Sequence, residues 1–364
     1  MTSILKTTEL YERRLSESLK LVQSDINFKH QQMSLGCFPF LRATFYRWAQ
    51  ICPEVCPELN SAPLVLGVGD LHVENFGTWR DSEGRLVWGV NDFDEAAIMP
   101  YCLDLTRLAV SANLEFADSH LRVDSHQTCE TLLRGYRDSL RCGGEPCILA
   151  EKNDWLRRLA QGELRNPISF WRKLDGMNTI EKDLPESASL LLKKQLPDKD
   201  LPHRIVARRS GLGSLGRQRF VALADWRGGR IAREVKASAP SAWEWANPET
   251  KKTANASQTL ASKAVRCPDP FLSVNKNWIC RRLAPDCSRV ELGTLHDEEN
   301  AVRLLYAMGF ETGNIHLASP KAIPLILKDL ETRGESEWLQ AAAEAMTKAT
   351  KTDWKDWKNR DSRG

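Results

Sequence analysis

One stretch of the sequence, residues 64–112, constrains the fold of this chain more than any other. It reads LVLGVGDLHVENFGTWRDSEGRLVWGVNDFDEAAIMPYCLDLTRLAVSA, and its segments VGD, VEN and VND place polar acceptors directly after apolar runs. Short apolar runs bounded by glycine or turn residues are typical of buried strands. An acceptor beside such a strand needs partners, because the loss of its hydration costs free energy. We therefore expect Asp70, Asn75 and Asp92 to converge at one end of a hairpin.

The rest of the sequence predicts helices around a few further strands. Residues 1–32 show an amphipathic pattern, and residues 37–55 are rich in aromatic side chains that we expect in a core. A segment near residue 185 combines prolines with many charges, which favours a linker or a boundary between lobes. Helices are expected at residues 104–174, 256–267, 295–310 and 336–358, and strands at residues 62–70, 219–224 and 230–237. This mixture predicts an α+β protein.

Composition limits the kind of protein that this chain can be. Its 364 residues carry a net charge of +3. A dedicated nucleic-acid-binding protein usually has a strong basic excess, so we expect no nucleic-acid partner. No apolar run reaches membrane-spanning length, and the N-terminus lacks the apolar core of a signal peptide. The ten cysteines show no complete zinc-ligand spacing. We expect most of them to be reduced and buried, and the protein to be cytoplasmic.

Oxygen ligands that converge at one end of a hairpin favour a hard cation. Carboxylate and amide oxygens suit magnesium, which in turn holds phosphate groups. A further aspartate could orient a hydroxyl group for attack on such a phosphate. The alternative is that these residues are turn residues and helix caps. Asp104 fits that alternative, because it precedes a helical pattern and would be a cap or a buried strut.

Two segments of this stretch resemble the protein-kinase-like superfamily, and in particular its aminoglycoside and choline kinase branch. GDLHVEN is similar to the catalytic loop of that branch, and NDFDEA, followed by DLTRLA, is similar to its metal loop and the helix after it. The resemblance implies that Asp70 is the catalytic aspartate and that His72 supports it or contacts phosphate. It also implies that Asn75 and Asp92 are magnesium ligands, with Asp94 beside them in the metal loop.

The second half of the chain contains a segment that resembles a kinase glycine-rich loop followed by its lysine strand. The matching residues lie in GLGSLGRQRFVAL and REVKAS. In such a loop, glycines let backbone N–H groups approach phosphates. The alternative for the loop alone is a flexible hairpin end. The resemblance assigns nucleotide binding to five residues: Gly211, Gly213, Ser214, Gly216 and Lys236.

The order of these segments departs from that of kinases, because here the glycine loop follows the catalytic loop. The implied fold is therefore an α+β, two-lobed, protein-kinase-like fold with permuted lobe order, in which a small antiparallel sheet faces a large helical lobe. The expected parts are a helical lobe with the catalytic and metal loops at residues 1–190, a β-rich lobe at residues 191–290, and packing helices at residues 291–364. The ion-pair partner of the lysine stays open among three candidates: Glu244, Glu249 and Gln258.

The motifs also resemble one bacterial family, domain of unknown function 2252. They are FPFLRATFYRW, GDLHVENFG, NDFDEA, DLTRLAVS, SGLGSLGRQRFVAL and REVKAS, and they span roughly residues 33–290. This resemblance is close, but it implies no activity by itself. The functional hypothesis therefore rests on the kinase-like motifs.

Four other residues near these motifs have alternative roles. Arg42 either pairs with the acidic cluster or extends to the surface. Arg208 and Arg209 could meet phosphates, but we expect a solvated charge pair. His316, in the segment GNIHLAS, is expected to be a partly buried histidine with its hydrogen bonds satisfied, and not a metal or phosphate ligand.

The sequence favours a phosphotransferase, or a nucleotidyl transferase, that uses ATP and Mg²⁺, with Mn²⁺ as an alternative ion. The acceptor would be a hydroxyl group on a small molecule or a protein. One alternative is a protein without catalysis that binds a nucleotide and regulates a partner. Another is a metal-dependent phosphoesterase, because GDLH and NDFDE resemble metal-binding blocks of calcineurin-like phosphatases. That class also uses an early D-x-H block and a Gly-Asn-His-Asp/Glu block, which this sequence lacks.

Overall fold

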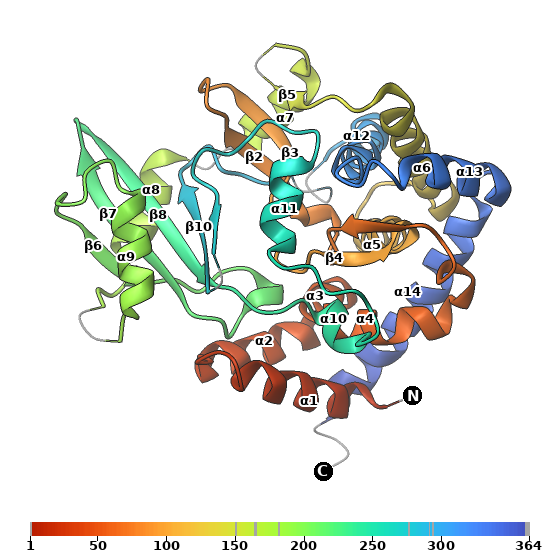
Figure 1. The fold of residues 1–364 in the computed structure, drawn as a ribbon, viewed down its shortest axis with the longest axis horizontal. Helices are drawn as coiled ribbons and strands as arrows, with labels where there is room; N and C mark the ends of the chain where they lie inside the picture. The colour runs from red at the N-terminus through yellow and green to blue at the C-terminus, as the bar shows by residue number, and fades with distance from the viewer. Residues whose placement is uncertain are drawn as a thin grey trace.

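The helices and strands lie close to the places that the apolar patterns indicate. The computed structural model describes residues 2–149, 151–163, 166–180, 183–275, 277–290, 292 and 295–360. An antiparallel sheet lies next to a larger body made mostly of helices (Figure 1). This arrangement confirms the α+β class. The kinase-like relationship, the permuted order and the lobe boundaries stay predictions.

The largest sheet is built from the second half of the chain. Its strand order is β6-β7-β8-β10-β9, and neighbouring strands run antiparallel. The strands are β6 (Arg204–Ala207), β7 (Arg219–Trp226), β8 (Gly229–Ala237), β9 (Ser273–Val274) and β10 (Trp278–Leu283). Arg227 and Gly228, with φ values of 47° and 82°, form the turn between β7 and β8. The register of this hairpin places Arg219 opposite Lys236.

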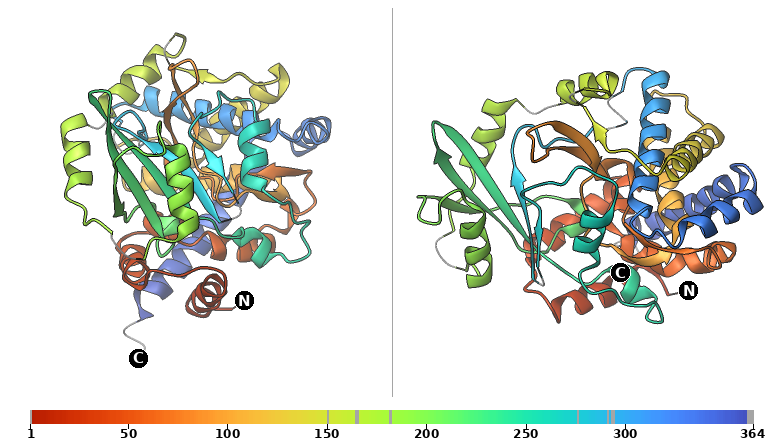
Figure 2. Two further views of the ribbon diagram at one scale, coloured as in Figure 1. Left: turned by 60° about the vertical axis from the view of Figure 1, so that its left-hand side comes forward. Right: turned by 45° about the horizontal axis from the view of Figure 1, so that its top comes forward.

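Alternate residues of this sheet pack against two different helices. Phe220 and Val235 belong to an apolar cluster with α9 (Glu186–Gln195), whereas Val221 belongs to a cluster with α8 (Pro167–Asp175). The two helices lie on opposite sides of the sheet (Figure 2). The segment near residue 185 is therefore no linker, because it leads directly into α9, whose leucines cover one face of the sheet.

Two smaller antiparallel sheets carry the acidic loops. They consist of β1 (Leu64–Gly67) with β4 (Ala97–Pro100), and of β2 (Phe76–Arg80), β3 (Leu86–Val90) and β5 (Cys147–Ile148). Gly67 lies opposite Ala97, so the end of β1 is next to the start of β4. Phe76 lies opposite Val90, so the start of β2 is next to the end of β3. This register brings the loops that follow β1 and β3 together.

Helices form most of the remaining described chain. The α-helices are α1 (Ile4–Ser16), α2 (Gln23–Leu35), α3 (Cys37–Ala43), α4 (Phe45–Val55), α5 (Tyr101–Ala117), α6 (Ser125–Cys142), α7 (Asp154–Glu163), α10 (Ala242–Ala246), α11 (Ala256–Lys263), α12 (Glu298–His316), α13 (Ile323–Arg333) and α14 (Glu337–Lys358). Short 3₁₀ turns are η1 (Pro57–Leu59), η2 (Val73–Asn75) and η3 (Leu212–Ser214). The expected helical stretch of residues 104–174 is interrupted after α6, where Gly143 adopts a left-handed conformation that ends the helix. No helix in the described ranges is long and apolar enough to cross a membrane.

Helices α6 and α12 cross in direct backbone contact. A Cβ atom on Gly309 would overlap the Leu132 carbonyl group, and one on Gly135 would overlap the Tyr306 carbonyl group. Only glycine permits so close an approach at these two positions. The crossing places the end of α12, which carries His316, beside the first turn of α5.

Asp104, in the first turn of α5, ties that helix to the loop that follows β1. Its Oδ2 accepts a hydrogen bond from the Val68 N–H at 2.7 Å, and its Oδ1 accepts one from the Gly69 N–H at 2.8 Å. His316 Nε2 lies 3.0 Å from Asp104 Oδ2, and His316 Nδ1 lies 2.8 Å from the Tyr136 hydroxyl. Asp104 is therefore a buried strut and not a helix cap. His316 has its hydrogen bonds satisfied, as expected, but it is fully buried.

The strut role of Asp104 predicts a large loss of stability in Asp104→Ala. The substitution leaves two backbone N–H groups and a buried histidine without their acceptor, so the free energy of unfolding should fall by about 3 kcal/mol or more. Urea unfolding measures this change. Asp225→Ala is the matched control, because the Asp225 side chain is 90% exposed. The control should lose less than about 0.5 kcal/mol. A loss in Asp104→Ala no larger than that of the control would contradict the assignment.

Candidate active site

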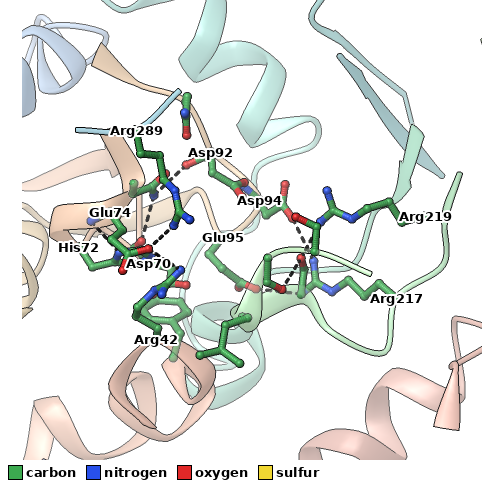
Figure 3. A pocket seen from close by; sticks show the side chains of 18 of the residues that line it. Arg42, Asp70, His72, Glu74, Asp92, Asp94, Glu95, Arg217, Arg219 and Arg289 are labelled. Carbon is green, nitrogen blue, oxygen red and sulfur yellow. Dashed lines mark hydrogen bonds and ion pairs between the residues drawn. The ribbon is translucent and has the colours of Figure 1, made fainter. Parts of the chain in front are cut away.

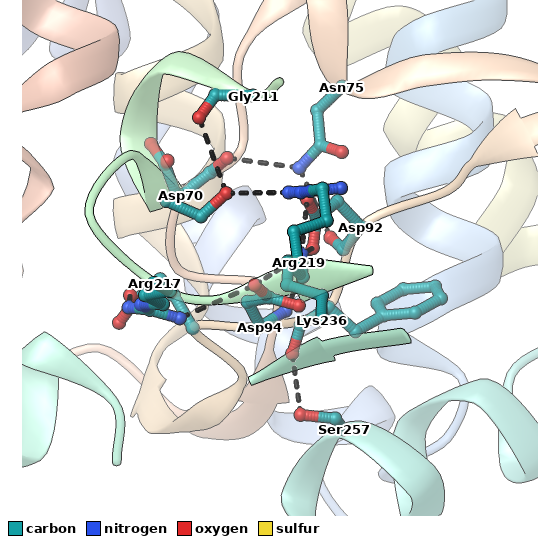
Figure 4. Close-up of polar contacts among 12 residues, drawn as sticks. Asp70, Asn75, Asp92, Asp94, Gly211, Arg217, Arg219, Lys236 and Ser257 are labelled. Carbon is teal, nitrogen blue, oxygen red and sulfur yellow. Dashed lines mark hydrogen bonds and ion pairs between the residues drawn. The ribbon is translucent and has the colours of Figure 1, made fainter. Parts of the chain in front are cut away.

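One side-chain amide holds the two acidic loops together. Asn75 is buried, and its Nδ2 donates to the Asp70 carbonyl at 3.0 Å and to the Asp92 carbonyl at 3.2 Å. The Asn75 carbonyl in turn accepts a hydrogen bond from the Asn91 N–H at 3.1 Å. Asp70, Asn75 and Asp92 thus converge, as the sequence predicts (Figure 4). Their chemical roles stay predictions.

Asp70 forms an ion pair with the buried side chain of Arg107, which comes from α5. Arg107 Nε lies 2.9 Å from Asp70 Oδ1, and its Nη2 also donates to that oxygen and to the Leu41 carbonyl at 2.9 Å. The guanidinium carbon lies 5.0 Å from the ring centre of Phe45 and 5.2 Å from that of Trp48. Burial raises the pKa of Asp70, and Arg107 opposes this shift. Both contacts of Arg107 use Oδ1 of the Asp70 carboxylate and not Oδ2.

His72 and Glu74 follow in the same loop. His72 Nδ1 accepts a hydrogen bond from the Glu74 N–H at 3.2 Å. Burial lowers the pKa of His72, and the positive charges of Arg42, Arg107 and Arg289 lower it further. The imidazole is therefore neutral at neutral pH, and the hydrogen bond to Nδ1 assigns its proton to Nε2. The Glu74 carboxylate pairs with Arg42 at 2.9 Å and also with Arg289.

Lys236 of β8 forms ion pairs with both aspartates of the loop after β3. Its Nζ lies 3.3 Å from Asp92 Oδ2 and also contacts Asp94 Oδ2. The lysine side chain is only 1% exposed. Burial lowers the pKa of Lys236, and the two carboxylates oppose this shift. Asp92 and Asp94 are therefore the ion-pair partners of Lys236. The three candidates from the sequence were Glu244, Glu249 and Gln258.

The two aspartates differ in charge and exposure. Burial alone would raise the pKa of Asp92, but Lys236 and Arg281 outweigh burial and hold that pKa well below its ordinary range. Burial and the neighbouring Asp92 raise the pKa of Asp94. The Asp92 side chain is 38% exposed, whereas that of Asp94 is 10% exposed. Asp92 is therefore the anionic group that this loop presents to solvent.

Arg217 links the loop after β3 to the end of the glycine loop. Its Nη1 lies 3.4 Å from Asp94 Oδ2, and its Nη2 donates to Glu95 Oε1 at 2.9 Å. Glu95 Oε2 also accepts a hydrogen bond from the Ala242 N–H at 2.6 Å. Burial raises the pKa of Glu95, and Arg217 opposes this shift. The arginine thereby joins segments that are more than a hundred residues apart in the sequence.

A buried carboxylate, that of Glu234, holds two arginines where the glycine loop meets the sheet. Arg219 Nη1 lies 2.6 Å from Glu234 Oε1, and Arg208 pairs with Oε2. Arg219 Nη2 donates to the Ser214 hydroxyl at 2.9 Å. Burial alone would raise the pKa of Glu234, but Arg219 and Arg208 outweigh burial and lower it to about 2. Glu234 is therefore a permanent anion inside this group of cations.

The glycine loop between β6 and β7 lies directly over Asp70. Gly211 and Gly216 have φ values of 76° and 95°, in the region that favours glycine. A Cβ atom on Gly213 would lie 3.0 Å from the Arg42 carbonyl oxygen and 3.2 Å from Asp70 Oδ2. The loop therefore closes a cavity of about 380 Å³ over the acidic residues (Figure 3).

Arginines are the feature of this cavity that sequence reasoning mostly missed. Seven of them line it: Arg42, Arg208, Arg217, Arg219, Arg281, Arg282 and Arg289. Arg281 lies opposite Glu234 in the pairing of β10 with β8. Strand alternation in REVKAS and CRRL indicates which residues share a face, but not which strands are neighbours. The pairing of the strands brings the arginines together at the cavity. It also brings Glu234 into contact with Arg208 and Arg219.

The oxygen atoms at the cavity fit a magnesium ion. Oδ1 of Asn75 and Oδ1 of Asp94 are buried and make no hydrogen bond within the described ranges. In that part of the chain, His, Cys, Asp and Glu side chains form no group of three or more suited to a metal ion. Magnesium does not require such a group, because it often binds one or two carboxylates together with phosphate oxygens. Asn75, Asp92 and Asp94 can supply such a partial ligand set.

Comparison with known proteins places the chain in a family. It matches the family described as "Uncharacterized protein conserved in bacteria (DUF2252)" over residues 21–167 and 174–360. The chain belongs to this family. Both acidic loops, the glycine loop and Lys236 lie within the matched segments. No curated protein and no solved structure matches the chain.

The remaining basic residues considered from the sequence take different places in this DUF2252 protein. Arg42 lies at the acidic cluster, where it pairs with Glu74. The expectation of a solvated charge pair is wrong for Arg208, which lines the cavity and contacts Glu234. It holds for Arg209, which is 45% exposed and lies 2.7 Å from Asp25 Oδ1. Arg208 continues directly from β6, and its backbone N–H donates to the Arg219 carbonyl at 3.1 Å, so Arg208 and Arg209 are successive extended residues whose side chains point in opposite directions.

The low pKa of Glu234 predicts how the stability of this DUF2252 protein depends on pH. A carboxylate whose pKa falls from 4.5 to about 2 on folding stabilises the native state above its unfolded pKa, and the contribution disappears as pH falls toward 2. Glu234→Gln should therefore lose about 3 kcal/mol at about pH 7, and less than half of that at about pH 3. Urea unfolding of wild type and variant across this pH range measures the difference. Glu249→Gln, on an exposed residue, is the control. A difference that stays constant with pH would contradict the assignment.

Proposed function

We propose that this protein is a phosphotransferase that moves a phosphoryl group from ATP, with Mg²⁺ or Mn²⁺, to a hydroxyl acceptor, with nucleotidyl transfer as the alternative chemistry of the same site. The contact of Lys236 with Asp92 carries the proposal, because it joins two residues 144 positions apart and ties the lysine of the sheet to an aspartate that lines the cavity under the glycine loop. A polyphosphate needs cationic donors and a metal ligand side by side. This cavity offers both.

The glycine loop and the arginines of the sheet would bind the phosphates of the nucleotide. Gly211, Gly213 and Ser214 line the cavity, and the Ser214 hydroxyl accepts a hydrogen bond from Arg219. A guanidinium group binds phosphate oxygens in a bidentate manner, which fixes their orientation. Lys236 is buried behind Asp92, so in this state it orients the carboxylate and does not itself face the cavity.

Asn75, Asp92 and Asp94 would hold the metal ion. When bound, the ion neutralises the charge that develops on the transferred phosphate. The Asn75 amide group remains tied to the backbone of both acidic loops through Nδ2, which leaves its Oδ1 for a ligand. Asp92 is the most exposed of the three, and its carboxyl group has the lower pKa of the two aspartates. We therefore assign to Asp92 the main contact with the ion.

Asp70 would orient the acceptor. Arg107 fixes Oδ1, and Oδ2 lies under the glycine loop. An acceptor hydroxyl that donates to Oδ2 points its oxygen toward the phosphates. That oxygen then forms a bond to the γ-phosphorus, the bond from the γ-phosphorus to the β–γ bridging oxygen breaks, and ADP leaves with the electron pair. The hydroxyl proton passes to Asp70, which acts as the general base.

A second candidate is a nucleotide-binding regulatory protein without catalysis. The observation in its favour is that the acidic groups are already paired: Asp70 with Arg107, and Asp92 and Asp94 with Lys236. A carboxylate that stays in such a pair accepts a proton less readily. A measurement of ATP turnover distinguishes the two candidate functions, because both would bind nucleotide and only the phosphotransferase would consume it.

The metal role of Asp92 predicts a specific loss in Asp92→Asn. Wild type should gain roughly 2.7 kcal/mol of stability at a hundredfold excess of nucleotide over Kd. The variant should lose the part of this gain that depends on magnesium, because an amide oxygen is a weaker ligand than a carboxylate. Thermal unfolding with ATP, with and without magnesium, measures both parts. Asp225→Asn is the control on an exposed strand position. An unchanged magnesium-dependent shift in Asp92→Asn would refute the role.

The role of Asp70 predicts a different kind of loss in Asp70→Asn. The amide oxygen can still accept the Arg107 hydrogen bonds, so nucleotide binding should stay nearly intact. Turnover should fall by about a hundredfold or more, the scale expected when a general base is lost. ATP consumption with a panel of metabolites and protein extracts measures turnover, and thermal unfolding with ATP checks binding in the same variant. Equal turnover in variant and wild type would exclude Asp70 as the base. Binding without turnover in wild type would favour the regulatory candidate.

A further inference from the structure

A second cavity lies in the helical body, away from the glycine loop. Its volume is about 380 Å³, and residues of α6, α7, α12, β3 and β5 line it. In Figure 1 these elements lie at the edge of the molecule opposite α1 and α2. The cavity shares no lining residue with the one under the glycine loop. Its size falls in the range of small-molecule sites, which have volumes of about 300–1,000 Å³.

Aromatic side chains form much of the wall of this second cavity. Trp155, Tyr306 and Phe310 line it, and all three are half-buried, so the surrounding chain does not cover their rings completely. The ring centres of Tyr306 and Phe310 lie 6.3 Å apart, and the two ring planes are tilted by 36°. The buried ring of Trp88 adds a fourth aromatic side chain. Aromatic walls of this kind favour a planar aromatic ligand, which can stack on them or meet them edge to face.

Two polar residues of the wall have hydrogen-bonding capacity left over. Glu311 is 2% exposed, and its oxygens accept hydrogen bonds from the Val90 N–H at 3.1 Å and from Asn314 Nδ2 at 3.0 Å. A carboxylate has about four acceptor positions, so Glu311 can accept further bonds. The buried Nε1–H of Trp88 donates to no acceptor in the described part of the chain, although buried N–H groups are almost always paired. A ligand with a polar N–H or O–H group would therefore find an acceptor in this wall.

Charged groups of both signs surround the second cavity. Four cations line it or lie next to its walls: Arg134, Lys152, Arg266 and Arg303. Three carboxylates oppose them: Asp138, which accepts a hydrogen bond from the Tyr306 hydroxyl, Glu145, which pairs with Lys152, and Glu311. The charges nearly balance, so they select strongly for neither an anion nor a cation. The aromatic walls and the single buried carboxyl group therefore decide which ligand fits.

We infer that this cavity binds a small, neutral, planar aromatic molecule, whose ring packs among Trp155, Tyr306 and Phe310 and whose N–H or O–H group donates to Glu311. The inference is independent of the proposed function, because the two cavities have no lining residue in common. It assigns a second ligand site to the protein, whether or not the first site transfers phosphate.

The test uses three probes that separate the ring from the donor. Indole has a planar ring and an N–H donor, N-methylindole has the ring without the donor, and cyclohexanol has a donor without a planar ring. Isothermal titration calorimetry would measure the affinity of each probe. Burial raises the pKa of Glu311 to about 7, so the titrations are run at about pH 8, where the carboxylate form prevails.

The test variant is Trp155→Ala/Phe310→Ala, which removes two of the aromatic walls. The matched control is Trp171→Ala/Phe271→Ala, which removes two half-buried rings outside the cavity, each with an arginine stacked on it. Wild type and control should bind indole at least about tenfold more tightly than N-methylindole, the scale of a hydrogen bond to a charged group. They should also bind indole more tightly than cyclohexanol. The test variant should lose at least about tenfold in indole affinity, because aromatic anchors dominate binding in such pockets.

Glu311→Gln tests the proposed acceptor itself. The variant keeps the shape of the side chain and removes its charge, so the ratio of indole to N-methylindole affinity should fall to within about threefold. A purely structural effect of the substitution would weaken both probes alike and leave this ratio unchanged. Thermal unfolding without probes checks the fold of each variant, and if the double variant does not fold, the Glu311→Gln comparison decides.

Four results would each overturn the inference. They are no indole binding by wild type, equal indole affinity in the test variant and wild type, binding of cyclohexanol or N-methylindole as tight as that of indole, and an unchanged affinity ratio in Glu311→Gln. The comparison of probes in wild type needs no substitution, so it remains decisive even where a variant is unstable.

Discussion

The ion pairs of Lys236 with Asp92 and Asp94 are the interaction on which the rest of the site depends. They connect β8 of the large sheet to the loop after β3, so they fix how the sheet lies against the helical body. The lysine is almost fully buried, and loss of one partner would leave an uncompensated charge away from water. Because Arg219 lies opposite Lys236 in the sheet, the same contact also positions the glycine loop over Asp70.

Around this contact, two further carboxylates of the cavity each contact two arginines. Glu74 contacts two arginines on one side of the loop after β3, and Glu234 contacts two on the other. These carboxylates hold the guanidinium groups in place before any ligand arrives. Cations fixed in a site with little water interact strongly with an anion and need no reorganisation when it binds. The arginines that line this cavity therefore favour an anionic ligand.

The sequence predicted the local parts of this site well, because they depend on short segments. Apolar runs ending at Asp70, Asn75 and Asp92 were enough to expect their convergence, since hairpin register places the two ends of β2 and β3 together. The partner of Lys236 was not predicted, although Asp94 stood in the segment already singled out. That contact depends on how the sheet packs on the body, which no short segment encodes. The arginines at Glu234 were missed for the same reason, because Arg208 and Arg219 belong to different strands or loops from the carboxylate that joins them.

Lys236 and the proposed metal ion need the same oxygen atoms, and this has a consequence for the order of binding. The ammonium group of Lys236 contacts Asp92 and Asp94. A divalent cation that joined it there would place like charges close together in a poorly solvated site, which is costly. Under the proposed function, the phosphates of a nucleotide would supply the negative charge that lets both cations remain. Metal and nucleotide would then bind as a unit, each weakly without the other, and Lys236 would couple them.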